Sequence, residues 1–149
     1  MNTASPPSIR HFARRLLPSD GTQPHDGEAV RAFQRGCRSL HAALAPLITS
    51  AAFEALVWRA LHVARREFPV LDGVTFDAAQ CSFGPLPESL SAEKEHLAGD
   101  ALALVLANLL WLLVTLLGTH LTVRAVKAAW PEVSTDEARS ILHEGTRDD

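Results

Sequence analysis

The residues best suited to metal chemistry in this 149-residue chain are a few cysteines, histidines and acids at helical spacing. Cys37 and His41 are four positions apart, so a helix would place both on one face, as a metal site requires. Cys37 also falls on an apolar stripe, and a free cysteine is among the most buried residue types, which favours core packing. Glu93-x-x-His96 resembles half of a di-iron carboxylate site, but such sites use the motif twice and the sequence has one copy. The sequence therefore predicts no metal site.

Two further histidines, His62 and His120, lie in otherwise apolar helical segments, where an imidazole could ligate a haem iron. Together with His41 they define one functional alternative, a cofactor-binding helical sensor. A hydrogen-bonded or half-exposed histidine is the commoner role. Gly-x-Ser-x-Gly, glycine-rich phosphate loops and His-Glu-x-x-His are absent from the sequence. We therefore predict a protein that is not an enzyme, with no catalytic residues and no cofactor.

Three arginines, Arg31, Arg35 and Arg38, recur at spacings of four and three and would line one face of a helix. A nucleic-acid reader needs such a stripe, usually on a basic domain with aromatic or amide side chains between the cations. This chain carries a net charge of −3 and a pI of about 6.1, which argues against nucleic acid. We predict that the three arginines form a solvated face or bind an acidic protein partner.

The segment 101–117 is the element around which the rest must be organised, because it holds nine leucines and no charge. Fully burying one large aliphatic side chain is worth roughly 1.5–3 kcal/mol, whereas a whole domain is stable by only about 5–15 kcal/mol. The segment must therefore be covered by the rest of the chain, by a partner or by lipid.

A membrane span through this segment is the second functional alternative, a single-pass or peripheral membrane protein anchored through residues 97–118 in the inner membrane. The stretch approaches the roughly 20 apolar residues that a bilayer requires, but it contains Asp100. Its polar residues also fall on one narrow face, as expected where a buried helix meets other helices: Asn108, Thr115, Thr119 and Thr122. We favour a soluble core helix and a cytoplasmic location, which also suits a chain with two cysteines and no apolar leader near its start.

The apolar periodicity predicts an all-α fold, a compact bundle of four to five helices around that long buried helix. Residues 1–27 are expected to be a mobile N-terminus with one short helix over 9–17, and residues 28–149 a single helical bundle domain. The other helices are expected at 28–46, at 51–68 after a Ser50 cap, at 91–130 with a bend near Gly118, and at 134–145. Gly36, inside the second helix, suggests that a neighbouring backbone approaches closely there.

Residues 70–90 lack a helical period and are expected to form a crossing loop of about 20 residues. Within it, Asp72-Gly73 could turn a small β-hairpin between Val70-Leu71 and Val74-Thr75-Phe76.

A row of small residues, Gly99, Ala103 and Ala107, would let two helix backbones approach closely. Packing within the chain is one interpretation and a homodimer seam is the other. An unbroken helix over 91–130 would be about 60 Å long, more than a compact chain of this size spans, and this favours the seam. Charge is also uneven, with +4 on residues 1–69 and −7 on residues 70–149, a pattern that can favour contact between subunits.

Two stretches together resemble a group of small, uncharacterised, all-helical bacterial proteins. They are Arg59-Ala60-Leu61-His62 with the following Ala64-Arg65 and Glu67-Phe68-Pro69, and L-L-G-T-H-L-T-V-R-A-V-K-A-A-W-P-E over 116–132. The resemblance implies a bacterial, helical, cytoplasmic protein and carries no activity. The leading hypothesis is a non-enzymatic interaction module, an adaptor or regulatory subunit that self-associates as a homodimer or other homo-oligomer in a bacterial assembly or signalling system.

Overall fold

Six α-helices and one short hairpin make up the described part of the chain. The computed structural model describes residues 5–17, 28–71, 75–77, 82–84 and 95–147, with backbone alone at a few element ends. In chain order the elements are α1 (Pro7–Leu16), α2 (Glu28–Leu44), α3 (Ser50–Arg65), the 3-10 turn η1 (Pro69–Leu71), β1 (Thr75–Asp77), β2 (Ser82–Gly84), α4 (Glu95–Leu117), α5 (Thr119–Ala129) and α6 (Thr135–Arg147).

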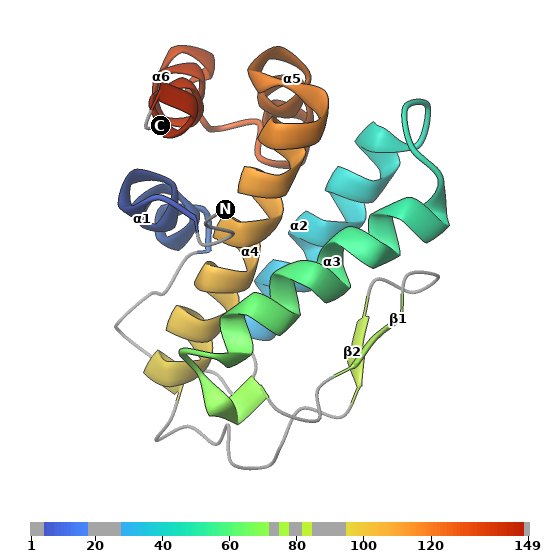
Figure 1. Cartoon of the computed structure of the whole chain (residues 1–149), viewed down its shortest axis with the longest axis vertical. Helices are drawn as coiled ribbons and strands as arrows, with labels where there is room; N and C mark the ends of the chain where they lie inside the picture. Colours follow the sequence, from blue (N-terminus) through green and yellow to red (C-terminus); the bar gives the residue numbers. More distant parts are fainter. Residues whose placement is uncertain (1–4, 18–27, 72–74, 78–81, 85–94, 148–149) are drawn as a thin grey trace.

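The apolar helix α4 runs through the middle of the molecule, with α1 on one side and α2 and α3 on the other (Figure 1). It contacts all five of the other helices. Every residue from 101 to 110 is buried by the chain itself. The prediction of an all-α bundle around this helix is confirmed, and so is the prediction that the earlier helices cover it.

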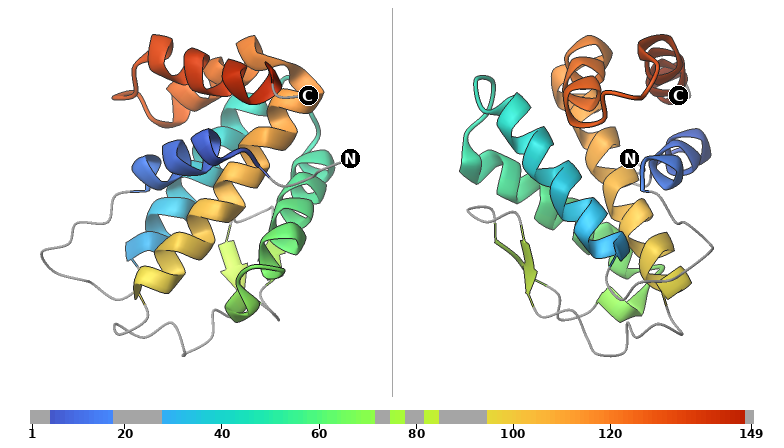
Figure 2. Two further views of the ribbon diagram at one scale, coloured as in Figure 1. Left: turned by 60° about the vertical axis from the view of Figure 1, so that its left-hand side comes forward. Right: turned by 180° about the vertical axis from the view of Figure 1, so that it is seen from behind.

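Gly118 divides the predicted long helix into two, which accounts for six helices instead of four to five. Its φ of 88° lies where only glycine is readily accommodated. The chain turns sharply there, and α5 crosses the end of α4 to pack against α2 and α6. Figure 2 shows α5 and α6 side by side over this end of the bundle. The predicted bend near Gly118 is confirmed.

The N-terminal helix α1 belongs to the bundle. Its inward side chains enter the common core, Ile9 with no exposed surface and Phe12 with 2%. Apolar spacing predicted this face correctly, and α1 shares one core with the helices that follow residue 27. Residues 18–27 lie outside the described part of the chain.

Several predicted helix ends are shifted. The cap of α3 is Thr49 and not Ser50, because the Thr49 hydroxyl accepts the Ala52 amide at 3.1 Å. The same helix ends at Arg65, three residues before the predicted end, and α6 continues through Gly145 to Arg147. Residues 91–94, where the long helix was predicted to begin, lie outside the described residues.

The hairpin exists, but it lies further along the chain than predicted. Val70-Leu71 belongs to η1, and the strand at Thr75–Asp77 pairs antiparallel with Ser82–Gly84. Phe76 is 3% exposed and packs against Phe53, with ring centroids 6.5 Å apart. This ring contact attaches the predicted crossing segment to α3.

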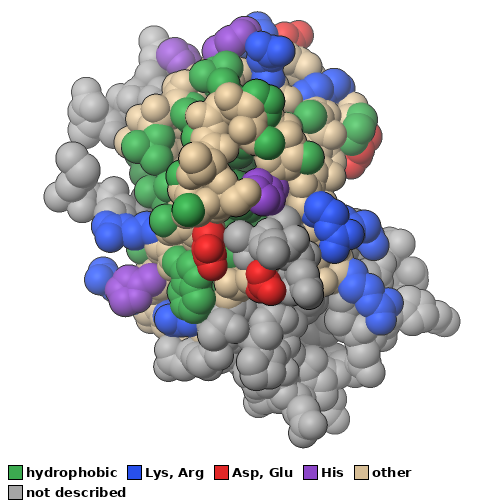
Figure 3. Space-filling model, turned by 90° about the vertical axis from the view of Figure 1, so that its right-hand side faces the viewer, with side chains coloured by type: hydrophobic (Ala, Val, Ile, Leu, Met, Phe, Trp, Pro, Cys, Tyr) green, Lys and Arg blue, Asp and Glu red, His purple; other side chains and the backbone are tan. Residues whose placement is uncertain are grey.

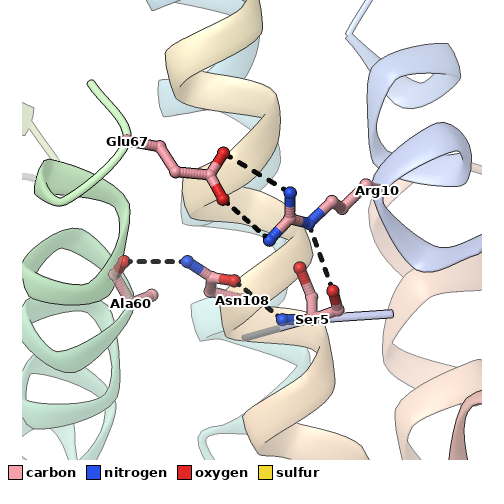
Figure 4. Close-up of polar contacts among 5 residues, drawn as sticks. All are labelled: Ser5, Arg10, Ala60, Glu67 and Asn108. Carbon is pink, nitrogen blue, oxygen red and sulfur yellow. Dashed lines mark hydrogen bonds and ion pairs between the residues drawn. The ribbon is translucent and has the colours of Figure 1, made fainter. Parts of the chain in front are cut away.

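One buried amide joins three parts of the fold (Figure 4). The Asn108 side chain donates to the Ala60 carbonyl of α3 at 3.2 Å and accepts the Ser5 backbone amide at 3.3 Å. Arg10 adds an Nε donor to the Ser5 carbonyl at 3.1 Å and an ion pair to Glu67 at 3.1 Å. Asn108 therefore fixes how α4 meets both α3 and the segment before α1.

Two other members of the predicted polar seam, Thr115 and Thr122, bond within their own turns. Thr115 donates to Trp111 O at 2.8 Å and Thr122 donates to Gly118 O at 2.9 Å. The break at Gly118 separates the face of Thr115 from that of Thr122, so the seam does not extend along one straight helix.

Gly36 allows a close approach, but by a side chain and not by the expected backbone. A Cβ built on Gly36 would meet three atoms of the Trp130 ring. Trp130 ends α5 and is 7% exposed. Its indole therefore packs onto α2 at Gly36, because only glycine has no side chain to occupy that space.

Candidate functional site

The C-terminal end of α4 leaves the core and exposes apolar side chains. Its Gly99–Leu117 stretch is long and apolar enough to span a membrane, and 67% of the most apolar window is buried inside the chain. The uncovered part includes Leu116, which is 63% exposed, with Trp111 and Leu112 half-buried one turn earlier. An exposed leucine at the end of an otherwise enclosed helix is the first component of a candidate interaction surface.

An apolar groove at the same end of the molecule is the second component. It has a volume of about 350 Å³ and lies between the end of α2, the α2–α3 turn and one face of α5. Leu47, 49% exposed, forms one wall with Pro46, and Leu121 and Ala125 form the other, with Arg124 at the polar edge. Figure 3 shows hydrophobic side chains gathered over the upper half of this face. We call Leu47, Leu116 and the groove the α5-end surface.

The three arginines of the predicted partner face are arranged as expected. Arg31, Arg35 and Arg38 all lie exposed on α2. Arg35 also lines a shallow depression of about 320 Å³ that Trp130 and Glu132 border. Binding of an acidic partner there stays a prediction.

The arginines of α1 make contacts inside the fold. Arg14 pairs with Asp100 of α4 at 3.0 Å, and Arg15 pairs with Glu137 of α6. Part of the charge difference between the two halves of the sequence is therefore neutralised between packed helices.

The row of small residues lies inside the chain. Gly99 and Ala103 are buried, Ala107 has no exposed surface, and the Arg14 guanidinium lies over Gly99. In this structure the row is buried within the chain, as the intramolecular interpretation expects. Self-association of the chain stays a prediction, and the α5-end surface is a better location for it.

Cys37 and His41 serve the core. Cys37 is 1% exposed in the central cluster, while the His41 ring stacks on Phe53 at 4.8 Å and its Nε2 lies 3.1 Å from Ser50 Oγ. Within the residues that the structure describes, no three histidine, cysteine or acidic side chains come together as metal ligands. The burial of Cys37 agrees with the preference for core packing at that position.

Of the remaining chemistry candidates, the structure describes the side chains of His62 and His120. Glu93 lies outside the described residues, and of His96 only the backbone is described. His62 is exposed on α3 and His120 is exposed on α5.

His120 does border a hollow of about 540 Å³ between the start of α5 and one face of α6. Sequence reasoning missed this hollow, although its α6 residues recur at helical spacing: Asp136, Arg139, Ser140 and His143.

Comparisons with family models, with curated proteins and with solved structures found no match to this chain. The resemblance carried by the 59–69 and 116–132 segments therefore stays a prediction. In the fold, the first segment runs from the second half of α3 to the start of η1, and the second runs from the end of α4 through α5.

Proposed function

We propose that this protein is a non-enzymatic helical interaction module that self-associates through the α5-end surface, as a subunit of a larger assembly. The observation that carries the proposal is the exposure of Leu116 and Leu47, the two large hydrophobic side chains that stand out in the described residues. Both lie at the end of the bundle where α5 crosses α4. Exposed apolar surface of this kind is typical of a contact site.

A second copy of the chain is the occupant that we propose. A two-fold contact places the same patch of both copies together. Leu116 and Leu47 of each copy would then be buried in the contact. Full burial of a leucine is worth roughly 1.5–3 kcal/mol, so the exposed parts of Leu116 and Leu47 contribute about 3–7 kcal/mol for two copies. A micromolar dimer requires about 8 kcal/mol and a millimolar one about 4 kcal/mol. We therefore expect a weak dimer that concentration controls.

Sedimentation velocity over a concentration series, without detergent, tests the proposal. The wild-type chain is expected to shift from monomer to dimer between roughly 1 μM and 1 mM. Leu116→Glu is expected to remain a monomer throughout, because a carboxylate would be desolvated in the contact. The free energy of unfolding of this variant should change by less than about 0.5 kcal/mol, since the side chain is largely in solvent.

Ala55→Glu is the matched control. It introduces the same charge at an exposed position of α3 that does not line the groove, and it should leave the dimer intact. A wild-type chain that stays monomeric at 1 mM would refute self-association. A dimer that both glutamate variants weaken equally would place the contact elsewhere.

A further inference from the structure

The hollow between α5 and α6 brings together side chains that recognise an oxyanion. Thr119 and His120 come from the first turn of α5, and Arg139, Ser140 and His143 come from α6. The positions on α6 are spaced by three and four, so they share one face of that helix. The hollow is open to solvent, and its volume of about 540 Å³ is within the range of small-molecule sites.

The donors in this hollow suit a tetrahedral anion. A guanidinium offers several N–H groups in a planar fork that fits phosphate, and hydroxyls and imidazoles donate further bonds. The first-turn amides of α5 lack a side-chain cap because the cap residue is Gly118, and a helix N-terminus favours negative charge. This helix end adds to the site formed by the side chains, which come from two helices.

One acid, Asp136, also lines the hollow. It lies in the first turn of α6, where a carboxylate suits the dipole of that helix. Arg139, which carries the opposite charge, lines the hollow three positions further along the same helix.

We propose that this hollow binds a small phosphate-type oxyanion, with Arg139 as the main ligand and His120 and His143 as further donors. The charged and titratable groups that line it are Asp136, Arg139 and His143 of α6 and His120 of α5. This site is separate from self-association and does not depend on it.

Inorganic phosphate is the probe. Titrating it into the full chain at pH 6.0, while the side-chain NMR signals of all seven histidines are followed, should shift two of them along a saturable curve. Substituting His120→Gln and His143→Gln one at a time assigns these two signals.

Two substitutions in the hollow have opposite expected effects. Arg139→Gln should weaken phosphate at least about tenfold, because it removes the charged donor. Asp136→Asn should strengthen it severalfold, because it removes a like charge beside the anion. The controls are His62→Gln, which alters an exposed histidine of α3, and Glu132→Gln, which removes one acid outside the hollow.

Unsaturable shifts of equal size in all seven histidine signals would overturn the site, and so would an affinity that Arg139→Gln leaves unchanged. A weaker affinity in Asp136→Asn would show that the hollow prefers a cation and would also overturn it. If Glu132→Gln strengthens phosphate binding as much as Asp136→Asn does, the gain comes from the net charge of the protein and not from the hollow. The phosphate affinity should be the same at two protein concentrations twentyfold apart. Agreement shows that phosphate binding does not depend on dimer formation.

Discussion

Replacing Gly36 by alanine sets two well-known effects against each other. Alanine is favoured over glycine by about 1 kcal/mol inside a helix, so propensity alone predicts stabilisation. In the fold, however, the new methyl group would lie against the Trp130 ring, closer than two carbon atoms can approach. Trp130 is 7% exposed in the core, so the ring has little space into which it can move.

The expected magnitude is the difference between these two effects. Overpacking a well-filled core costs about 1–3 kcal/mol, and subtracting the gain of about 1 kcal/mol from propensity leaves a net loss of about 0–2 kcal/mol. In a Trp130→Leu background the ring is gone and the same Gly36→Ala change should stabilise by up to about 1 kcal/mol. The coupling between the two positions is therefore expected to be about 1–3 kcal/mol.

Urea unfolding followed by far-ultraviolet circular dichroism measures all four proteins, and it avoids tryptophan fluorescence, which the Trp130 change would alter. Gly99→Ala is the matched control, because its Cβ would meet only the end of the flexible Arg14 side chain, at 3.0 Å. That control should be neutral or slightly stabilising. If Gly36→Ala stabilises the chain as much as the control does, and equally in both backgrounds, the proposed ring contact is wrong.

Four further substitutions test single features of the fold by the same unfolding measurement. Gly118→Ala should cost about 1–3 kcal/mol through backbone strain alone, since no atom lies within 4 Å of the added Cβ, and an unchanged stability would contradict the sharp turn. Thr49→Ala should cost about 1 kcal/mol and Ser50→Ala less than half of that, and the reverse order would restore Ser50 as the cap. Asn108→Leu should lower the free energy of unfolding by about 1–3 kcal/mol, because it leaves the buried Ser5 amide without its acceptor. A loss below about 0.5 kcal/mol would contradict the role of Asn108 in joining three segments.

Local rules predicted the helices and their inward faces well. Apolar spacing is a property of one helix, so the buried faces of α1, α2 and α3 could be predicted from neighbouring residues. The position of the bend was also local, because Gly118 comes directly after the leucine-rich segment. Predictions of single caps were less reliable, because Thr49 and Ser50 are both good capping residues and only the entry angle of the chain decides between them.

Contacts between residues far apart in the chain could not be predicted from the sequence. Arg15 meets Glu137 across 122 positions, and nothing in the local pattern of α1 indicates that acid. The same holds for the hollow, where His120 meets α6 only because the chain turns at Gly118. The exposure of Leu116 could not be predicted for a similar reason. A segment with nine leucines does not show where the helices that cover it end.

The burial of α4 also bears on where the protein is located. If α4 left the bundle to cross a bilayer, its own leucines would remain in an apolar medium, but the helices around it would lose their cover. Phe12, Phe33 and Phe53 belong to the same core cluster and are at most 2% exposed. Uncovering these three rings would cost about 5–9 kcal/mol, comparable to the whole stability of an ordinary domain. We therefore expect the chain to be recovered after cell lysis without detergent, and recovery only from the membrane fraction after an alkaline wash would contradict this reasoning.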